Sequence, residues 1–102
     1  MFVWDNSKRK KVIEEHSIDF DLISDIFEDP FSIDFEDAEH SDEEEIRYGI
    51  IGKTAEYGLI VLIYTVTNDD DIRFITARRA EKWMVKEYEK QRKRYWFQRK
   101  GV

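Results

Sequence analysis

The sequence contains no cysteine, one proline and four glycines among its 102 residues. Without cysteine the chain forms no disulfide, no thiolate zinc site and no iron–sulfur cluster, and it has no cysteine nucleophile. The scarcity of proline and glycine excludes collagen-like and linker-like chains. The longest apolar run, residues 59–64, is too short to span a membrane. Because the first residues also lack the apolar stretch of a signal peptide, we expect a cytoplasmic protein.

Aromatic and charged side chains are abundant instead. Aromatic residues make up 15% of the chain and charged residues 39%. The aromatic share is enough to build a core, which distinguishes the chain from a disordered acidic tail. We find no repeat or linker, and the length predicts a single domain over residues 1–102.

Charge is distributed unevenly, although the net charge is only −6. Residues 73–102 hold 11 of the 17 basic side chains and 3 of the 23 acidic ones, a net charge of +8, so residues 1–72 carry −14. The basic end favours binding to nucleic acid, whereas the acidic part repels it.

The hydrophobic pattern predicts an α+β fold, with a small antiparallel sheet, two N-terminal helices and a long C-terminal helix. A short strand over residues 2–4 is followed by a basic helix over residues 7–16, with Val12 and Ile13 as apolar anchors. Asp19 is expected to cap a second helix, which Asp29-Pro30 ends because proline clashes with a continuing helical turn.

Three strands are predicted in the second half of the chain. Residues 45–50 and 71–77 alternate between apolar and polar positions, and residues 59–66 are almost continuously apolar, as in a central strand. Short, turn-rich connections predict an antiparallel meander, with residues 32–36 as an additional edge strand.

The long helix is expected over residues 77–95. Its apolar stripe, expected to pack on the sheet, comprises Ala80, Met84, Tyr88, Gln91 and Tyr95. The opposite stripe forms a basic ridge of Arg79, Lys82, Lys86, Lys90 and Lys93.

Several segments together resemble one protein family. They are, in chain order, Trp4-Asp5 with Lys8, His16-Ser17-Ile18-Asp19-Phe20, Phe27-Glu28-Asp29-Pro30, His40-Ser41 with Glu45, Arg47 and Gly52, Tyr64-Thr65, and Ile72-Arg73-Phe74-Ile75-Thr76-Ala77-Arg78 with Ala80, followed by Tyr88. In their order and spacing they resemble the BrnT family of ribonuclease toxins of type II toxin–antitoxin systems. Val12, Glu15, Ser17, Thr76 and Met84 depart from the family pattern, and Met84 replaces the usual helix glutamate.

The resemblance implies a RelE-like fold, metal-independent cleavage of an RNA substrate without a cofactor, and a small BrnA-like antitoxin as partner. That antitoxin would bind DNA as a ribbon–helix–helix dimer, so we expect no direct DNA binding by this chain alone, and no membrane partner.

Metal-independent RNA cleavage needs a base for the 2′-hydroxyl, an acid for the leaving oxygen, and cations for the phosphorane. We interpret Arg47, Arg73 and Arg78 as phosphate clamps, because the guanidinium fork matches two phosphate oxygens. Arg78 is expected just past the last strand, near the start of the long helix, where backbone N–H groups favour anions. The alternative is that each arginine pairs with one of the many carboxylates.

His40 is the stronger of the two histidines for acid–base chemistry, because its segment is acidic and near the predicted sheet; the alternative is a surface histidine. Glu45 serves as a base, or holds Arg47 in place, or is simply solvated. His16 is expected to cap carbonyls at the end of the first helix. Tyr88 is a candidate for base stacking or proton donation, or else a core residue.

For RNA binding we select Arg79, Lys82, Lys86, Lys90 and Trp96. Trp96 and Phe97, between Arg94 and Arg99, form either a stacking surface for single-stranded RNA or a contact with an antitoxin or a second copy.

The acidic stretch of residues 36–45 does not match a common metal-nuclease pattern, because no Asp or Glu stands two residues before any Lys. The chain also lacks a phosphate-binding glycine loop. A second hypothesis, motivated by Met84, is a catalytically inactive domain that acts only by binding a partner protein.

Overall fold

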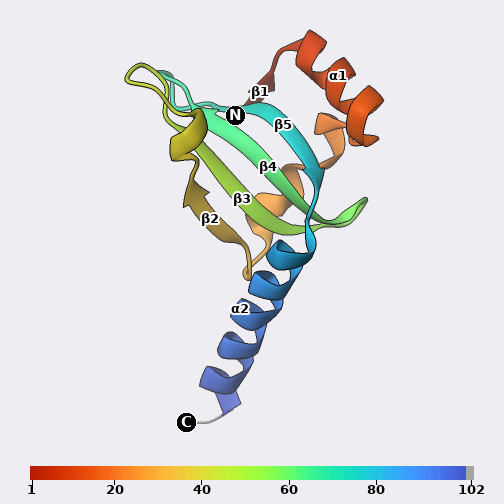
Figure 1. Ribbon diagram of the computed structural model, residues 1–102, viewed down its shortest axis with the longest axis vertical. Helices are drawn as coiled ribbons and strands as arrows, with labels where there is room; N and C mark the ends of the chain where they lie inside the picture. Colours follow the sequence, from red (N-terminus) through yellow and green to blue (C-terminus); the bar gives the residue numbers. More distant parts are fainter. Residues whose placement is uncertain (101–102) are drawn as a thin grey trace.

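Five strands form one mixed sheet with helical segments on both faces (Figure 1). The structure is a computed structural model that describes residues 1–100, with the side chains of residues 1–97. The elements are β1 (Phe2–Trp4), α1 (Asn6–His16), the 3₁₀ turns η1 (Phe20–Leu22) and η2 (Ser24–Glu28), β2 (Ile33–Glu36), the 3₁₀ turn η3 (Ala38–His40), β3 (Arg47–Thr54), β4 (Gly58–Val66), β5 (Ile72–Arg79) and α2 (Lys82–Lys100).

The strand order is β1-β5-β4-β3-β2. The predicted meander of β3, β4 and β5 is confirmed, and β2 is an antiparallel edge strand beside β3. The N-terminal strand, whose partner the sequence did not indicate, pairs in parallel with β5, with Trp4 beside Phe74. Since β1 covers only the first half of β5, α1 packs along the second half.

One face of the sheet carries most of the core. Phe20 and Phe74 are completely buried there, and Trp4 contacts both rings. Ile60 and Leu62 of β4 point into the same cluster, which α1, η1 and η2 cover. Burial of these large side chains supplies the main stabilisation of the fold.

The predicted second helix is instead two 3₁₀ turns. Phe20, Ile23 and Ile26 are spaced by three residues, and all three are completely buried. A 3₁₀ helix has about three residues per turn, so it aligns this spacing on one face better than an α-helix does. Asp19 caps η1 as predicted, since its carboxylate accepts the N–H of Asp21 at 3.0 Å.

The long helix begins at Lys82, not at residue 77 as predicted. β5 remains paired with β4 as far as Arg79, opposite Ile60, and the N–H of Ala80 still donates to the carbonyl of Leu59. These sheet hydrogen bonds hold the backbone extended where helical periodicity alone predicts a helix.

Only the first half of α2 packs on the second face of the sheet. Met84 and Tyr88 are buried there against Ile51 and Val61. Residues 90–97 are exposed, and the helix projects away from the sheet (Figure 1). The prediction that the whole apolar stripe packs on the sheet is therefore wrong for its second half, although Tyr95 still contacts the ring of Phe31.

Candidate active site

Two of the predicted arginines lie on either side of the central strand, on the second face of the sheet. Arg47 of β3 and Arg73 of β5 are both in register with Thr65 of the central strand β4. Residues in register across neighbouring strands point to the same face, so the three side chains form one row.

Arg78 reaches the same face because β5 contains a bulge. Arg73 and Arg78 are five positions apart, and regular alternation would place them on opposite faces. The register shifts between Ile63 and Tyr64, which leaves Ile75 as the extra residue. Beyond the bulge Arg78 pairs with Val61, whose side chain belongs to the second face.

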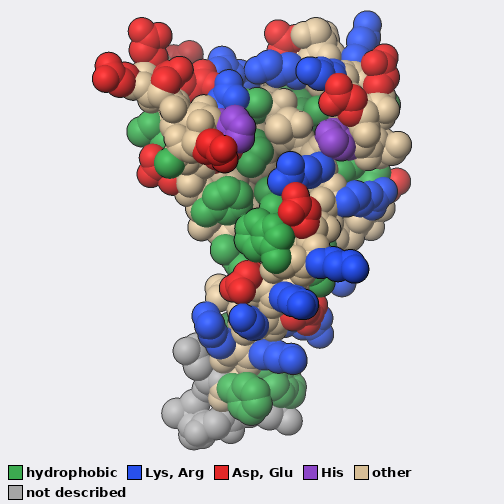
Figure 2. Space-filling model, in the orientation of Figure 1, with side chains coloured by type: hydrophobic (Ala, Val, Ile, Leu, Met, Phe, Trp, Pro, Cys, Tyr) green, Lys and Arg blue, Asp and Glu red, His purple; other side chains and the backbone are tan. Residues whose placement is uncertain are grey.

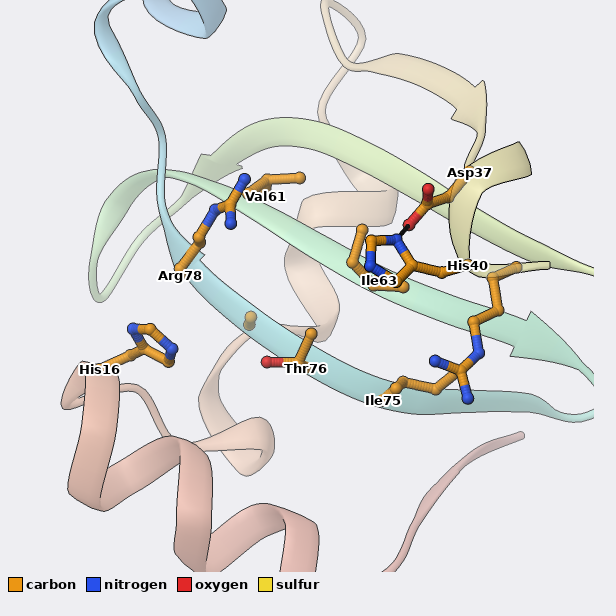
Figure 3. A pocket seen from close by; sticks show the side chains of 10 residues that line it. His16, Asp37, His40, Val61, Ile63, Ile75, Thr76 and Arg78 are labelled. Atoms are coloured by element: carbon orange, nitrogen blue, oxygen red, sulfur yellow. Dashed lines mark hydrogen bonds and ion pairs between the residues drawn. The ribbon is translucent and has the colours of Figure 1, made fainter.

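A cleft of about 210 Å³ opens on this face beside the part that α2 covers. Its floor is apolar, and its charged rim comes from four separate elements of the fold (Figure 3). The lining residues are His16, Asp37, His40, Arg47, Val61, Ile63, Ile75, Thr76, Ala77 and Arg78.

His40 lies at the rim in η3, as the acid–base interpretation requires. Its Nδ1 is 2.8 Å from Oδ2 of Asp37, and the imidazole is held above Ile63 (Figure 3). The Asp37 side chain is only 15% exposed, whereas that of His40 is 61% exposed. The partly buried Asp37 carboxylate fixes Nδ1 and leaves the other ring nitrogen, Nε2, available for chemistry.

His16 lies on the other side of the cleft, facing Thr76 and Arg78 (Figure 3). The predicted capping role belongs to its neighbour: Ser17 has φ 56° and donates its N–H to the carbonyl of Ile13. His16 Nε2 instead contacts Glu15 at 3.9 Å. The packing of α1 on β5 thus brings a second imidazole into the site.

His16 was not predicted to take part in chemistry, and Asp37 was not predicted as a site residue. His16 stands in one of the segments that resemble the family, which was a usable signal. Asp37 precedes His40 by three residues, a spacing that brings side chains together on a helical turn.

Glu45 links two of the arginines. Its Oε1 is 3.2 Å from Nε of Arg47, and its Oε2 is 2.7 Å from a terminal nitrogen of Arg73. Neither Glu45 nor Arg73 lines the cleft. These contacts support the interpretation that Glu45 holds Arg47 in place. The alternative in which each of the three predicted arginines pairs with a carboxylate is also observed, because Arg78 contacts Glu81.

Arg78 lies inside β5 and not at the helix N-terminus. The prediction that backbone N–H groups of the helix help Arg78 to bind an anion is therefore wrong. Its guanidinium is 51% exposed and lies 3.1 Å from Glu81, a residue just before α2. The strand continues because its pairing with β4 persists through Arg79.

Tyr88 is a core residue and does not line the cleft. It is 4% exposed, and its hydroxyl donates to Oδ2 of Asp29 at 2.8 Å. Burial, reinforced by this hydrogen bond, raises the pKa of Tyr88 far above its usual range, which makes it a poor proton donor. Met84 is 2% exposed in the same cluster, so the position of the family glutamate also lies outside the cleft lining.

The basic ridge is smaller than predicted. Arg79 belongs to β5, and it donates to the carbonyl of Tyr57 at 2.7 Å while lying over the Tyr57 ring. It is therefore turned away from α2. Lys82, Lys86 and Lys90 are exposed on α2, and Trp96 is 57% exposed near the end of the helix. The Arg99 side chain lies outside the described residues.

The charge asymmetry of the sequence becomes a spatial one. Figure 2 shows two histidines on either side of a hollow, with basic side chains around it and along α2. Acidic side chains gather over the segment between β2 and β3 (Figure 2).

Within the described side chains, no group of three or more His, Asp or Glu is arranged to hold a metal ion. No helix of the described region is long and apolar enough to cross a membrane.

Comparisons with known proteins agree with these features. A family model described as the ribonuclease toxin BrnT of type II toxin–antitoxin systems matches residues 4–83. The 1.1 Å crystal structure of the Brucella abortus ribonuclease toxin BrnT is similar to this chain, with a TM-score of 0.61 and 25% identity over 80% of this chain and 99% of that one. The comparison with curated proteins found no match. The family match contains every residue that lines the cleft and ends before Tyr88.

Proposed function

Because this chain belongs to the BrnT family of ribonuclease toxins of type II toxin–antitoxin systems, we propose that its cleft cleaves RNA by internal attack of a ribose 2′-hydroxyl, without a metal ion. The observation that carries this proposal is the placement of two histidines and two arginines around one cleft. Imidazoles supply a base and an acid near neutral pH, and guanidinium groups stabilise the charge that develops on phosphorus.

His40 acts as the base. Its Nε2 takes the 2′-hydroxyl proton, and the 2′-oxygen then forms a bond to the adjacent phosphorus. The contact of Nδ1 with Asp37 at 2.8 Å supports this assignment, because the carboxylate stabilises the imidazolium that results.

His16 acts as the acid on the opposite side of the cleft. In its protonated form it gives a proton to the 5′-oxygen as the bond between that oxygen and phosphorus breaks. The products are a 2′,3′-cyclic phosphate and a 5′-hydroxyl, so neither water nor a redox partner is consumed.

Arg47 and Arg78 bind the phosphate at the reaction. Both line the cleft, and both are partly exposed, with 31% and 51% of their side chains accessible. Their carboxylate partners are also partly exposed, so a phosphate can replace them at small cost.

The exposed lysines of α2, Lys82, Lys86 and Lys90, extend the RNA-binding surface beyond the cleft, and Trp96 offers a ring for base stacking. Membership of a type II family also implies an antitoxin partner. We propose that this partner is a BrnA-like ribbon–helix–helix protein, that DNA is contacted through it, and that the toxin acts in the cytoplasm.

Cleavage of a defined oligoribonucleotide by the purified chain tests the mechanism. We expect cleavage in the presence of EDTA, with 2′,3′-cyclic phosphate at the new end. A matched oligonucleotide with 2′-O-methyl groups should stay intact, because it has no attacking hydroxyl. Loss of cleavage in EDTA, or cleavage of the 2′-O-methyl oligonucleotide, contradicts the proposal.

Overexpression separates the toxin from an inactive binding domain. A toxin arrests growth, and the antitoxin encoded beside it relieves the arrest. The position of Met84 outside the cleft supports the active form, because the substitution there removes no side chain from the proposed reaction centre. Harmless overexpression together with a tight protein complex would instead support the inactive domain.

A further inference from the structure

Next to the cleft, one carboxylate occupies a position suited to a phosphate. Glu45 contacts Nε of Arg47 at 3.2 Å and a terminal nitrogen of Arg73 at 2.7 Å. Two guanidinium groups that share one carboxylate present the same charge and donor arrangement that binds two phosphate oxygens.

The segment that carries Glu45 is held in place by hydrogen bonds of its side chains and backbone. Asp42 accepts the N–H groups of Glu44 and Glu45 at 2.8 and 2.7 Å, and its own N–H donates to the carbonyl of Glu45 at 3.0 Å. Ser41 then accepts the N–H of Arg47 at 2.8 Å, which joins this turn to the start of β3. A contact from β4 also holds the turn, because the hydroxyl of Thr65 donates to the carbonyl of Ile46 at 2.7 Å. Together these hydrogen bonds place the carboxylate beside the two arginines.

The ion pairs that Glu45 makes with Arg47 and Arg73 are also accessible to solvent. The side chains of Glu45, Arg47 and Arg73 are 30%, 31% and 41% exposed. A depression of about 430 Å³ lies over this region, with Glu45, Thr65 and Arg73 in its lining. Ion pairs with this much solvent contact contribute little to stability, so exchange of one anion for another is inexpensive.

We propose that Arg47 and Arg73 form a second phosphate site, which binds the RNA phosphate next to the one cleaved, and that the Glu45 carboxylate is a built-in competitor that RNA must displace. Arg47 lines the cleft and contacts Glu45, so it joins the two sites. The proposal rests on the proposed function, because it assigns the neighbouring phosphate of the same RNA. Arg73 does not line the cleft, so its proposed role is to bind RNA and not to take part in cleavage.

Binding of a fluorescent 2′-O-methyl oligonucleotide tests this proposal, because that ligand cannot be cleaved by attack of a 2′-hydroxyl. Glu45→Gln should bind about threefold to tenfold more tightly than the unsubstituted chain, since amide oxygens compete poorly for arginine. Glu39→Gln is the matched control: it makes the same change of charge on an exposed residue of the neighbouring turn η3, outside the lining of the depression, and we expect a smaller gain.

Arg73→Ala should remove most of the gain, so that the double variant Arg73→Ala/Glu45→Gln binds more tightly than Arg73→Ala by no more than the factor that the control variant gives. Equal gains for Glu45→Gln and Glu39→Gln would show a general charge effect and overturn the proposal. Weaker binding by Glu45→Gln would do the same, because it would make Glu45 a positioning residue for the arginines. These outcomes do not depend on cleavage, so a chain without nuclease activity fails the earlier test and can still pass this one.

Discussion

The two faces of the sheet use the same strands for different purposes. One face is covered by α1, η1 and η2 and carries completely buried side chains such as Phe20 and Leu62. The other face is covered in part by the first turns of α2, and its more open part carries Arg47, Thr76 and Arg78 around the cleft. A chain of this size can therefore leave part of one face open when the opposite face supplies the stability.

The largest effect is expected on the packed face. Phe20→Ala should lower the free energy of unfolding by about 4 kcal/mol, because it removes a buried ring and leaves a cavity. Ile63→Ala, at the half-buried floor of the cleft, should cost about half as much. Urea unfolding measures both values. Equal losses would show that the two faces contribute alike.

Substitutions on the open face should change the rate of RNA cleavage more than the stability of the fold. His40→Ala is expected to reduce the rate of RNA cleavage about 100-fold or more, because the base is lost. The midpoint of thermal unfolding should hardly change, since the side chain is 61% exposed. Glu39→Ala, an exposed neighbour in η3, serves as the control. A variant without His40 that cleaves at the normal rate would remove this residue from the mechanism.

Arg78 and Arg79 are adjacent but belong to opposite faces, which makes them a matched pair. Arg78→Ala should slow cleavage about tenfold or more, because the clamp on the phosphorane is lost. Arg79→Ala should leave the rate unchanged and destabilise the fold by about 1 kcal/mol, through loss of its contacts with Tyr57. Single-turnover kinetics and unfolding curves distinguish the two. The reverse result would mean that the bulge does not orient these side chains as described.

The smallest effect is expected at Tyr88, under α2. Tyr88→Phe should cost about 1 kcal/mol of stability through loss of the bond to Asp29, with no change in cleavage rate.

Tyr88 should also make the stability of the fold depend on pH. Because the pKa of Tyr88 is raised in the folded state, the unfolded chain loses this proton first, and stability falls as pH rises above about 10. Tyr88→Phe should weaken that fall. Tyr64, whose pKa burial also raises, accounts for part of what remains. An identical pH profile for the variant would contradict the assignment to Tyr88.

Much of the fold follows from local patterns. Alternation and the apolar run of β4 indicate the meander, and Asp19 caps η1 as expected. The limits of α2 could not be predicted from periodicity, because long-range pairing with β4 keeps Arg78 and Arg79 in the sheet. Because Arg79 remains in the sheet, it is not part of the basic ridge on α2.

The candidate site was predictable in part. Arg47, Arg78 and His40 were selected by type and position, and all three line the cleft. Of the two alternatives for Tyr88, a chemical role or a core residue, the structure supports the core residue, because Tyr88 shares a helical stripe with Met84 and is buried with it. His16 was not selected, because its place in the cleft depends on the packing of α1 against β5.

The sequence by itself determined the fold class, the order of the strands along the chain and the kinds of side chain available for phosphate chemistry, because these depend on composition and short-range periodicity. Only the tertiary structure decided which of those side chains meet. The bulge at Ile75 and the parallel pairing of β1 with β5 bring together groups far apart in the chain. No local pattern encodes such contacts, since they arise when distant segments compete for the same surfaces.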